Sequence, residues 1–234
     1  MNERKVKFTA VVLAAGFGRR MNSPVQKQYL VLNGKPLIYY TLDAFEKSPV
    51  DEIILVVGLD EVSYCKENIV DKFGFTKVKS IVTGGKERYH SVYNGLLEAA
   101  ESGYVLIHDG ARPFVSEEII RRNMDAVLEN KACVTAVPVK DTIKISDGEG
   151  FVKETPERSL VWQIQTPQTF EYELVRQAYD RLMEDGSISV TDDAMVVETF
   201  LGKRIKLVEG SYKNIKITTP DDLLIAQVFV GEGD

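Results

Sequence analysis

The sequence lacks any long hydrophobic run. No apolar stretch among its 234 residues approaches the ~20 needed to cross a bilayer. The first segment, Met1–Gly16, shows no hydrophobic stretch followed by a small-residue cleavage site, so we expect no secretory signal. We therefore expect a cytoplasmic protein that does not bind membranes.

Cysteine and histidine are both scarce. Cys65 and Cys133 have neither the spacing of metal ligands nor that of a redox pair, and both lie in apolar segments where a buried thiol is the simplest interpretation. The two histidines, His90 and His108, form no H-E-x-x-H motif. A histidine-rich metal site is therefore excluded.

Positive charge is also in deficit. The chain carries 29 lysines and arginines against 35 aspartates and glutamates, which gives a formal net charge of −6. Binding to a nucleic-acid backbone needs a basic face, so we exclude a nucleic-acid partner. A small anionic ligand remains compatible with this charge, because it needs only a few local cations.

The chain does contain an ordinary supply of core residues, 44% hydrophobic against 27% charged. Apolar runs predict strands at residues 8–13, 52–58, 78–82, 104–110 and 133–139. Helical spacing predicts helices at residues 35–46, 61–71, 87–100 and 116–130, and Ser116 is the expected N-cap of the last. This alternation with short connections predicts an α/β fold with a doubly wound, mostly parallel sheet.

The pattern changes at Lys140. Two short alternating strands around "DGEG" in residues 141–155 predict a β-hairpin that leaves the main sheet, and a second subunit is one candidate to cover its apolar face. Beyond it we expect helices at 170–183 and 191–201, strands at 205–210 and 214–218, and a last helix that begins at Pro220. With no repeat or linker, we expect one domain over residues 1–234, with the arm at about 140–160.

The segment "VVLAAGFGRRMNSPVQKQYL" begins as the first strand and continues into a glycine-rich, basic loop. Met21 replaces the third glycine of a dinucleotide fingerprint, and no Gly-Lys pair is followed by the hydroxyl residue of a P-loop. The remaining functional interpretation is a loop that wraps a nucleoside triphosphate. Gly16 and Gly18 would let backbone N–H groups approach phosphate, and Arg20 and Lys27 would supply charge. A solvated basic loop beside a structural turn is the alternative.

The pattern "AAGFGRRM…QKQYL" resembles the nucleotidyltransferases with a Rossmann-like fold, whose signature is G-x-G-x-R-[ML] followed by a lysine. From Val11 to about Ala226 the chain is similar to the 2-C-methyl-D-erythritol 4-phosphate cytidylyltransferase family. The segments that carry this similarity are "GGKERYHSVYNGL", "VLIHDGARPF", "PVKDTIK", "WQIQTPQTF", "TDDA" and "NIKIT". The resemblance implies a nucleotide-diphospho-sugar transferase-like fold. It also implies CMP transfer from CTP to the 4-phosphate of methylerythritol, with release of diphosphate, in non-mevalonate isoprenoid synthesis.

Asp109 ends the apolar strand of "VLIHDGARP", where open α/β sheets bind ligands. A lone carboxylate there suits Mg²⁺ or another divalent cation, which takes its other ligands from phosphate and water. A turn or capping aspartate is the alternative. The resemblance favours the metal and nucleotide role, and it implies that Gly110 lies near the ribose. We expect His108 to pack locally and not to catalyse.

The segment "TGGKERYHS" combines a glycine turn with the start of a helix, so Gly84 and Gly85 could present backbone groups to a base and Ser91 a hydroxyl. A plain turn before an amphipathic helix is the alternative. The resemblance assigns cytosine recognition to Gly85, Lys86 and Ser91. Lys86 departs from the acidic or small residue of the family, so a side-chain contact there would affect base selectivity.

The resemblance also implies roles for further residues that the sequence pattern alone does not indicate, since each of these residues could be an ordinary surface residue. It implies that Ala14, Ala15, Gly16, Phe17 and Gly18 contact the nucleotide. It implies catalytic roles for Arg20, Lys27, Arg158 and Lys216, of which Arg158 and Lys216 position the substrate phosphate. It implies substrate-binding roles for Arg112, Thr142, Thr166 and Thr191. In the family the hairpin arm is exchanged between the two subunits of a homodimer.

The implied reaction needs no general base, because the attacking phosphate oxygen is already anionic. Catalysis then depends on positioning and on charge stabilisation by Arg20, Lys27 and Mg²⁺ on Asp109. One alternative is a cytidylyltransferase for another polyol phosphate, such as ribitol 5-phosphate. Another is a nucleotide-binding module without turnover, which the joint presence of Arg20, Lys27 and Asp109 disfavours.

Overall fold

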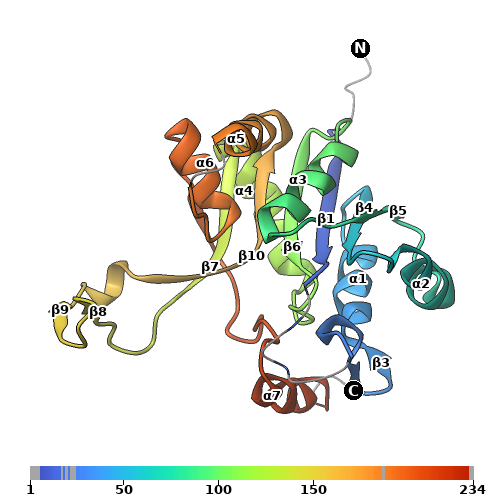
Figure 1. The fold of residues 1–234 in the computed structure, drawn as a ribbon, viewed down its shortest axis with the longest axis horizontal. Coiled ribbons are helices and arrows are strands. Elements are labelled where there is room, and N and C mark those ends of the chain that lie inside the picture. Colours follow the sequence, from blue (N-terminus) through green and yellow to red (C-terminus); the bar gives the residue numbers. More distant parts are fainter. Residues whose placement is uncertain (1–5, 17, 19–20, 22–24, 186–187, 232–234) are drawn as a thin grey trace.

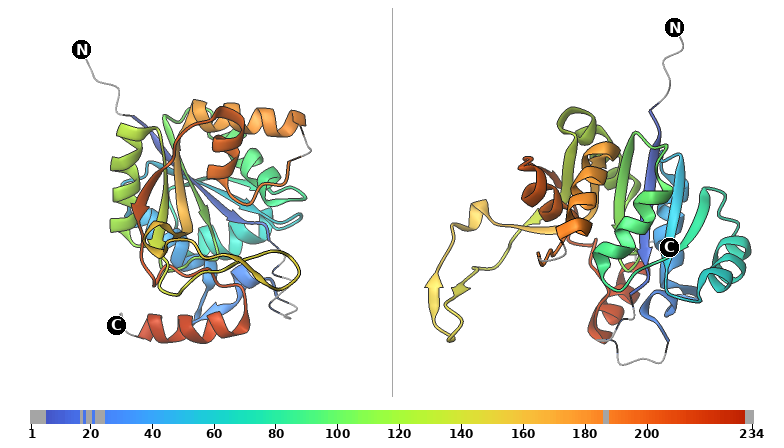
Figure 2. Two further views of the ribbon diagram at one scale, coloured as in Figure 1. Left: turned by 90° about the vertical axis from the view of Figure 1, so that its left-hand side faces the viewer. Right: turned by 45° about the horizontal axis from the view of Figure 1, so that its top comes forward.

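The computed structural model describes residues 6–16, 18, 21, 25–185 and 188–231. Among these, a seven-stranded sheet forms the middle of the molecule, with helices on both faces (Figures 1 and 2). Its strands are β1 (Phe8–Ala14), β4 (Glu52–Val57), β5 (Val78–Thr83), β6 (Tyr104–Asp109), β7 (Ala132–Pro138), β10 (Trp162–Glu171) and β11 (Lys206–Glu209). The strand order is β11-β7-β10-β6-β1-β4-β5.

Parallel pairing aligns the carboxyl ends of the central strands. β1 pairs in parallel with β4 and β6, and Leu13 lies opposite both Val56 and Asp109. β10 is antiparallel to its two neighbours, β6 and β7, while the other neighbouring pairs are parallel. The expected doubly wound, mostly parallel sheet is therefore confirmed, and it brings the loops after β1 and β6 to the same edge.

Alternate residues of the central strands enter two separate cores. Ala10 and Val12 face the core shared with α1 (Leu37–Lys47) and α4 (Glu117–Asn130). Val11 faces the opposite core, which is shared with three helices, α3 (Arg88–Glu98), α5 (Tyr172–Asp185) and α6 (Asp193–Leu201). A strand buried on both faces is apolar at nearly every position, which explains the hydrophobic runs in the sequence.

Several predicted boundaries shift for local reasons. The helix expected from residue 35 begins at Leu37, because β3 (Lys35–Pro36) pairs with β2 (Val31–Leu32) in a small hairpin. The helix expected at 61–71 divides into α2 (Val62–Cys65) and a wider π-helical segment, Lys66–Asp71. Ser116 is the N-cap of α4, as predicted, and its hydroxyl accepts the Ile119 N–H.

Two strand assignments differ from the sequence. The strand expected at 214–218 is wrong: this stretch belongs to no strand, and its backbone bonds to loops and side chains, as where the Ile217 N–H donates to the Ala111 carbonyl. The strand β10 was missed because Pro167 lies inside it among glutamines and threonines, a composition that disfavours a central strand. A register shift between Ile164 and Gln168 accommodates the proline.

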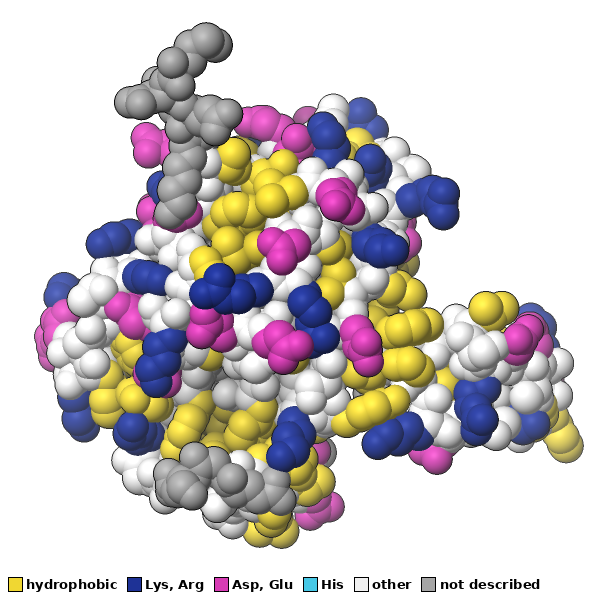
Figure 3. All heavy atoms as spheres, turned by 180° about the vertical axis from the view of Figure 1, so that it is seen from behind, with side chains coloured by type: hydrophobic (Ala, Val, Ile, Leu, Met, Phe, Trp, Pro, Cys, Tyr) yellow, Lys and Arg dark blue, Asp and Glu magenta, His cyan; other side chains and the backbone are white. Residues whose placement is uncertain are grey.

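The predicted hairpin is present and lies outside the main sheet. β8 (Ile145–Ser146) and β9 (Val152–Glu154) pair antiparallel at the end of an arm that leaves the body between β7 and β10 (Figure 1). Figure 3 shows the arm projecting from the body with hydrophobic side chains on its surface. Phe151 is 71% exposed and Leu160 is 75% exposed. Burial of such side chains is favourable, so the arm presents an apolar face without a cover inside the described part of the chain.

The last helix, α7 (Pro220–Gly231), lies below the carboxyl ends of the strands in Figure 1 and begins at the predicted proline. It shares a third small core with β2, the start of α1 and Ile217. The Asp222 carboxylate accepts the N–H groups of Thr218 and Thr219, which fixes the chain just before the helix. No helix in the described ranges is long and apolar enough to cross a membrane.

We expect Gly95→Ala to lower the free energy of unfolding by about 1–3 kcal/mol, because a methyl group there would overpack the core. Gly95 lies on α3 against β1 and β4, and an added Cβ would overlap Val11 and lie 3.1 Å from Val56 Cγ2. Urea unfolding measures the change. Gly231→Ala in α7 is the control, because nothing lies within 4 Å of its added Cβ. Equal stability of the two variants would contradict the close packing of α3 on the sheet.

Candidate active site

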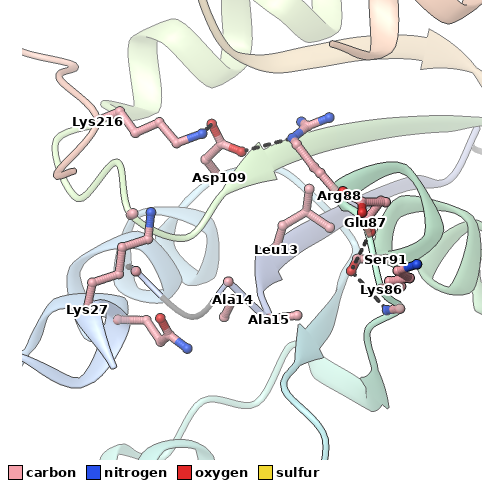
Figure 4. A pocket seen from close by; sticks show the side chains of 15 residues that line it. Leu13, Ala14, Ala15, Lys27, Lys86, Glu87, Arg88, Ser91, Asp109 and Lys216 are labelled. Carbon is pink, nitrogen blue, oxygen red and sulfur yellow. Dashed lines mark hydrogen bonds and ion pairs between the residues drawn. The ribbon is translucent and has the colours of Figure 1, made fainter. Parts of the chain in front are cut away.

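A pocket of about 400 Å³ opens at the carboxyl edge of β1 and β6 (Figure 4). One side is formed by the end of β1 and its loop, another by the turn before α3, and Asp109 and Lys216 close it. The lining residues are Leu13, Ala14, Ala15, Gly16, Gly18, Lys27, Gln28, Gly85, Lys86, Glu87, Arg88, Ser91, Asp109, Ala111 and Lys216. A concave site at the strand ends is where α/β sheets bind ligands.

The loop after β1 brings its backbone and Lys27 close together. Gly18 has φ +61°, and an added Cβ would lie 3.1 Å from both Cβ and Cγ of Lys27. Glycine is therefore required here both for its conformation and for the close approach of the lysine stem. Lys27 begins a short 3₁₀ turn whose end is anchored by Tyr29, because the Tyr29 hydroxyl donates to Glu61 at 2.8 Å. Phe17 and Arg20, two residues of the expected loop, lie outside the described residues.

The turn before α3 forms the opposite wall. An added Cβ on Gly84 would lie 2.7 Å from Ser91 Oγ, so the glycine allows the turn to pack directly against the helix. The Gly85 N–H donates to Ser91 Oγ at 3.0 Å. Ser91 thus holds the turn as well as facing the pocket, and Gly85, Lys86 and Ser91 come together on one wall (Figure 4).

Asp109 is a buried carboxylate surrounded by cations. Its Oδ2 lies 2.9 Å from Lys216 Nζ and 3.6 Å from Arg112 Nε, and its Oδ1 lies 3.4 Å from Arg88 Nε. Burial alone would raise the pKa of this carboxyl group, but the charges of its three partners outweigh burial and hold the pKa well below its usual range. Asp109 is therefore ionised at neutral pH.

The side chains around the pocket offer few ligands for a metal ion. Among the described residues, no three His, Cys, Asp or Glu side chains gather into a group that could hold a metal ion. Asp109 provides a single carboxylate, and both of its oxygens already face cations. This fits a Mg²⁺ only if phosphate oxygens and water supply most of the ligands.

Thr166 and Arg112 support Asp109 from within the protein. The Asp109 N–H donates to Thr166 Oγ1 at 3.0 Å, and that hydroxyl lies 3.1 Å from His108 Nδ1. Arg112 donates to the Asn214 carbonyl at 2.8 Å, which ties the Asp109 loop to the segment that carries Lys216. Thr166 is 3% exposed, so the view of these two as ordinary surface residues is wrong. Gly110 lies behind the pocket lining, where its N–H donates to the Leu13 carbonyl at 2.8 Å.

Six of the expected site residues that the structure describes are not part of the lining. Gly110, Arg112 and Thr166 contact residues of the lining, whereas the other three do not reach the pocket within one chain. Thr142 and Arg158 are exposed on the arm, where Arg158 donates to the Lys140 carbonyl at 3.4 Å. Thr191 is exposed just before α6, and its hydroxyl contacts Met195 Sδ at 3.6 Å.

Sequence reasoning missed five residues of the lining, which are Leu13, Gln28, Glu87, Arg88 and Ala111. Gln28 is 1% exposed and had no pattern to mark it. Arg88 stands in the glycine-turn segment, but its partners are distant in the chain: it forms two 2.8 Å contacts with Asp193, 105 positions away. The sequence pattern that could have identified Arg88 is an arginine in the first turn of a helix that follows a glycine turn.

His108 gives the site a pH-dependent support. Burial lowers the pKa of His108 to about 4, so it is neutral at pH 7. In the neutral form, Nε2–H donates to the Arg112 carbonyl at 3.2 Å and Nδ1 accepts from Thr166. The unfolded chain takes up this proton near pH 6.5, so the folded state loses stability as the pH falls from 6.5 towards 4.

We expect wild-type protein to lose about 2 kcal/mol of unfolding free energy between pH 7 and pH 5 through His108. Urea unfolding at both pH values measures the loss. His108→Gln keeps one donor and one acceptor without a titrating ring, so its loss should be smaller by that amount. Identical pH dependence in wild type and His108→Gln would contradict the prediction.

Comparisons with known proteins agree on one family. The model of the 2-C-methyl-D-erythritol 4-phosphate cytidylyltransferase family matches residues 8–232. A protein of that name from Lachnoclostridium phytofermentans is 52% identical over 226 residues, which are 97% of this chain and 97% of the relative. Another, from Lachnospira eligens, is 51% identical over 224 residues, which are 95% of this chain and 98% of the relative.

Solved structures are similar over the same length. The crystal structure of 4-diphosphocytidyl-2C-methyl-D-erythritol synthase from Anaerococcus prevotii gives a TM-score of 0.86 at 36% identity, over 97% of this chain and 96% of that chain. The crystal structure of 2-C-methyl-D-erythritol 4-phosphate cytidylyltransferase from Thermus thermophilus gives 0.77 at 30% identity, over 97% and 100%. The chain therefore belongs to the 2-C-methyl-D-erythritol 4-phosphate cytidylyltransferase family, as its sequence motifs suggested.

Proposed function

We propose that this chain transfers CMP from CTP to 2-C-methyl-D-erythritol 4-phosphate, which yields 4-diphosphocytidyl-2-C-methyl-D-erythritol and diphosphate in non-mevalonate isoprenoid synthesis. The observation that carries the proposal is the pocket at the carboxyl edge of β1 and β6. It combines a glycine loop, a second glycine turn and a group of cations around Asp109, in a chain that belongs to this family.

In this proposal CTP lies across the pocket. The cytosine contacts the wall formed by Gly85, Lys86 and Ser91, and the ribose lies near Asp109 and Gly110. The triphosphate follows the loop that contains Ala14, Ala15, Gly16, Phe17 and Gly18, where backbone N–H groups can meet phosphate oxygens. Gly16 supports this arrangement, because nothing lies within 4 Å of an added Cβ there and its backbone is open to a ligand.

Lys27 and Lys216 then act on the reacting phosphorus. The substrate phosphate attacks the α-phosphorus in line with the leaving diphosphate, and charge builds on the oxygens around that phosphorus. Lys27, with Arg20, stabilises this charge and the leaving group. Lys216, held at the pocket by Asp109, positions the incoming phosphate with Arg112 and Thr166 supporting it from behind. Because the attacking oxygen is already anionic, no general base is required.

The divalent cation of this reaction would be Mg²⁺ or a related ion. When bound, it neutralises phosphate charge and polarises the phosphorus–oxygen bonds. Asp109 is the protein oxygen ligand in this proposal, and the triphosphate brings the remaining ligands. A single carboxylate among cations would bind a free metal ion weakly, which supports a metal that arrives with the nucleotide.

We further propose one domain over residues 1–234 and a homodimer in which the arm at about 140–160 crosses to the partner. Thr142 and Arg158 would then complete the substrate side of the partner subunit's site, next to Thr191 and Lys216. The projecting arm and its exposed apolar side chains support this arrangement. A cytoplasmic location is supported by the buried thiols of Cys65 and Cys133.

We expect CTP and methylerythritol 4-phosphate to release diphosphate at least about 10²-fold faster than ATP or GTP with the same acceptor, because a site that hydrogen-bonds one base leaves its groups unpaired with another. A coupled diphosphate assay measures the rates. Ribitol 5-phosphate is the competing acceptor, and faster turnover with it would replace the proposed substrate. Absence of diphosphate release with every acceptor, while CTP still binds, would favour the non-catalytic alternative.

We expect Lys27→Ala and Arg158→Ala to be nearly inactive alone and to recover about a quarter of wild-type activity when their subunits are exchanged. Random exchange makes about half of the dimers mixed, and in an isologous dimer one of the two sites then receives an intact loop and an intact arm. Diphosphate release measures the recovery.

Distinguishable tags confirm the exchange in this experiment. The control is a mixture of Lys27→Ala subunits that carry the two tags, which should stay inactive after exchange. If Arg158 acts within its own chain, every site keeps one defect and no activity returns, which would refute the crossed arm.

A further inference from the structure

Arg88 connects two carboxylates that lie on different elements. Its Nη1 and Nη2 each lie 2.8 Å from an Asp193 oxygen, and its Nε lies 3.4 Å from Asp109 Oδ1. Arg88 is in the first turn of α3, Asp193 begins α6, and Asp109 ends β6. One guanidinium therefore joins three parts of the fold at the wall of the pocket, and Figure 4 shows its contact with Asp109.

The Asp193 end of this connection is rigid. Asp193 is fully buried, and its Oδ1 also accepts the hydroxyl of Tyr179 on α5 at 2.6 Å. The preceding residue, Asp192, caps α6 by accepting the Met195 N–H at 2.9 Å. A bidentate pair with a fixed carboxylate holds the plane of the guanidinium, so the remaining Nε–H can point in only one direction.

The Asp109 end bears on the proposed chemistry. Lys216 and Arg112 both contact Oδ2, and of the described residues only Arg88 reaches Oδ1. Without Arg88, both remaining cations would contact Oδ2, and no described residue would hold Oδ1. The carboxylate would then be held at one oxygen only, and the position of Lys216 would change with any rotation of the carboxylate.

We propose that Arg88 is a positioning residue for the reaction: fixed by Asp193 and Tyr179, it sets the orientation of Asp109 and, through it, the place of Lys216 in the pocket. This inference rests on the proposed function, because Lys216 is taken to hold the incoming phosphate. Arg88 itself acts through Asp109, and its effect falls on the rate more than on substrate affinity, since displacement of a catalytic group by even ~1 Å can cost ~10²-fold.

The main test replaces the buried ion pair by apolar side chains of similar size. In the triple variant Arg88→Met, Asp193→Leu, Tyr179→Phe, the Arg88–Asp193 pair and its tyrosine hydroxyl are removed together, while Asp109 keeps Lys216 and Arg112 on Oδ2 and loses its contact at Oδ1. Such replacements of a whole buried ion pair are often neutral for stability. We expect a melting temperature near that of the wild type, kcat lower by about 10- to 100-fold, and KM for CTP changed by less than about threefold.

A chemically matched trio serves as the control. Arg176, Asp180 and Tyr93 join α5 to α3 with the same residue types, Arg176 Nε and Tyr93 Oη each lying 2.9 Å from Asp180 Oδ1. None of the three lines the pocket. The variant Arg176→Met, Asp180→Leu, Tyr93→Phe should therefore keep the wild-type kcat.

The conservative variant Arg88→Lys separates positioning from simple charge balance. A lysine can neutralise Asp193, but its three N–H donors leave a single nitrogen and lack the planar fork of a guanidinium, so it cannot hold the two carboxylates in the same fixed geometry. We expect Arg88→Lys to fold and to lose kcat about 10-fold or more. Wild-type kcat in Arg88→Lys would overturn the proposal, and this variant decides the question if the triple variant does not fold.

Wild-type turnover tests the proposed function separately. If the wild type does not turn over, the crystal structures of the variants decide, because the Asp109 carboxylate and Lys216 Nζ should leave their wild-type positions in the triple variant and keep them in the control. Unchanged positions there, or unchanged kcat in a folded triple variant, would refute the role of Arg88. A lower kcat shared equally by the control trio would also refute it.

Discussion

An ionised carboxylate can be buried at the end of β6 only because cations surround it. Asp109 is 7% exposed, and the cost of burying its charge is met by Arg88, Arg112 and Lys216. Each of these cations comes from a different segment. The need to neutralise Asp109 therefore holds the first turn of α3, the loop after β6 and the stretch before α7 in place around it. The pocket exists where these segments meet, and its shape depends on that charge balance.

The sequence was informative wherever the signal was local. The apolar runs of β1 and β6 predicted a parallel sheet, and the position of Asp109 at the end of such a run indicated the pocket edge. The glycines before Lys27 and before α3 indicated close backbone approach. Each of these inferences used residues within about one turn or one strand of each other, where periodicity and spacing carry the information.

The rest depended on contacts between distant residues. β10 has a composition that disfavours a central strand, and it takes that place because β6 and β7 both need a partner. The burial of Thr166 follows from the same strand and had no mark of its own. Arg88 and Asp193 are ordinary charged residues in the sequence, and their pairing is visible only once α3 and α6 lie on the same face of the sheet. Local sequence patterns do not predict such tertiary contacts.

The charge around Asp109 also determines how ligands reach the site. The chain as a whole is acidic, with a net charge of −6. Among the residues that line this pocket, however, four cations, Lys27, Lys86, Arg88 and Lys216, outnumber two carboxylates, Glu87 and Asp109. The positive field at the pocket attracts a small multivalent anion. A long polyanion also extends over the rest of the protein, whose net charge is negative and repels it. Added salt therefore slows the encounter with the anion more than it weakens the contacts made inside the pocket. The charge pattern of the surface thus favours compact anions over extended ones, before any contact with a base or a sugar forms.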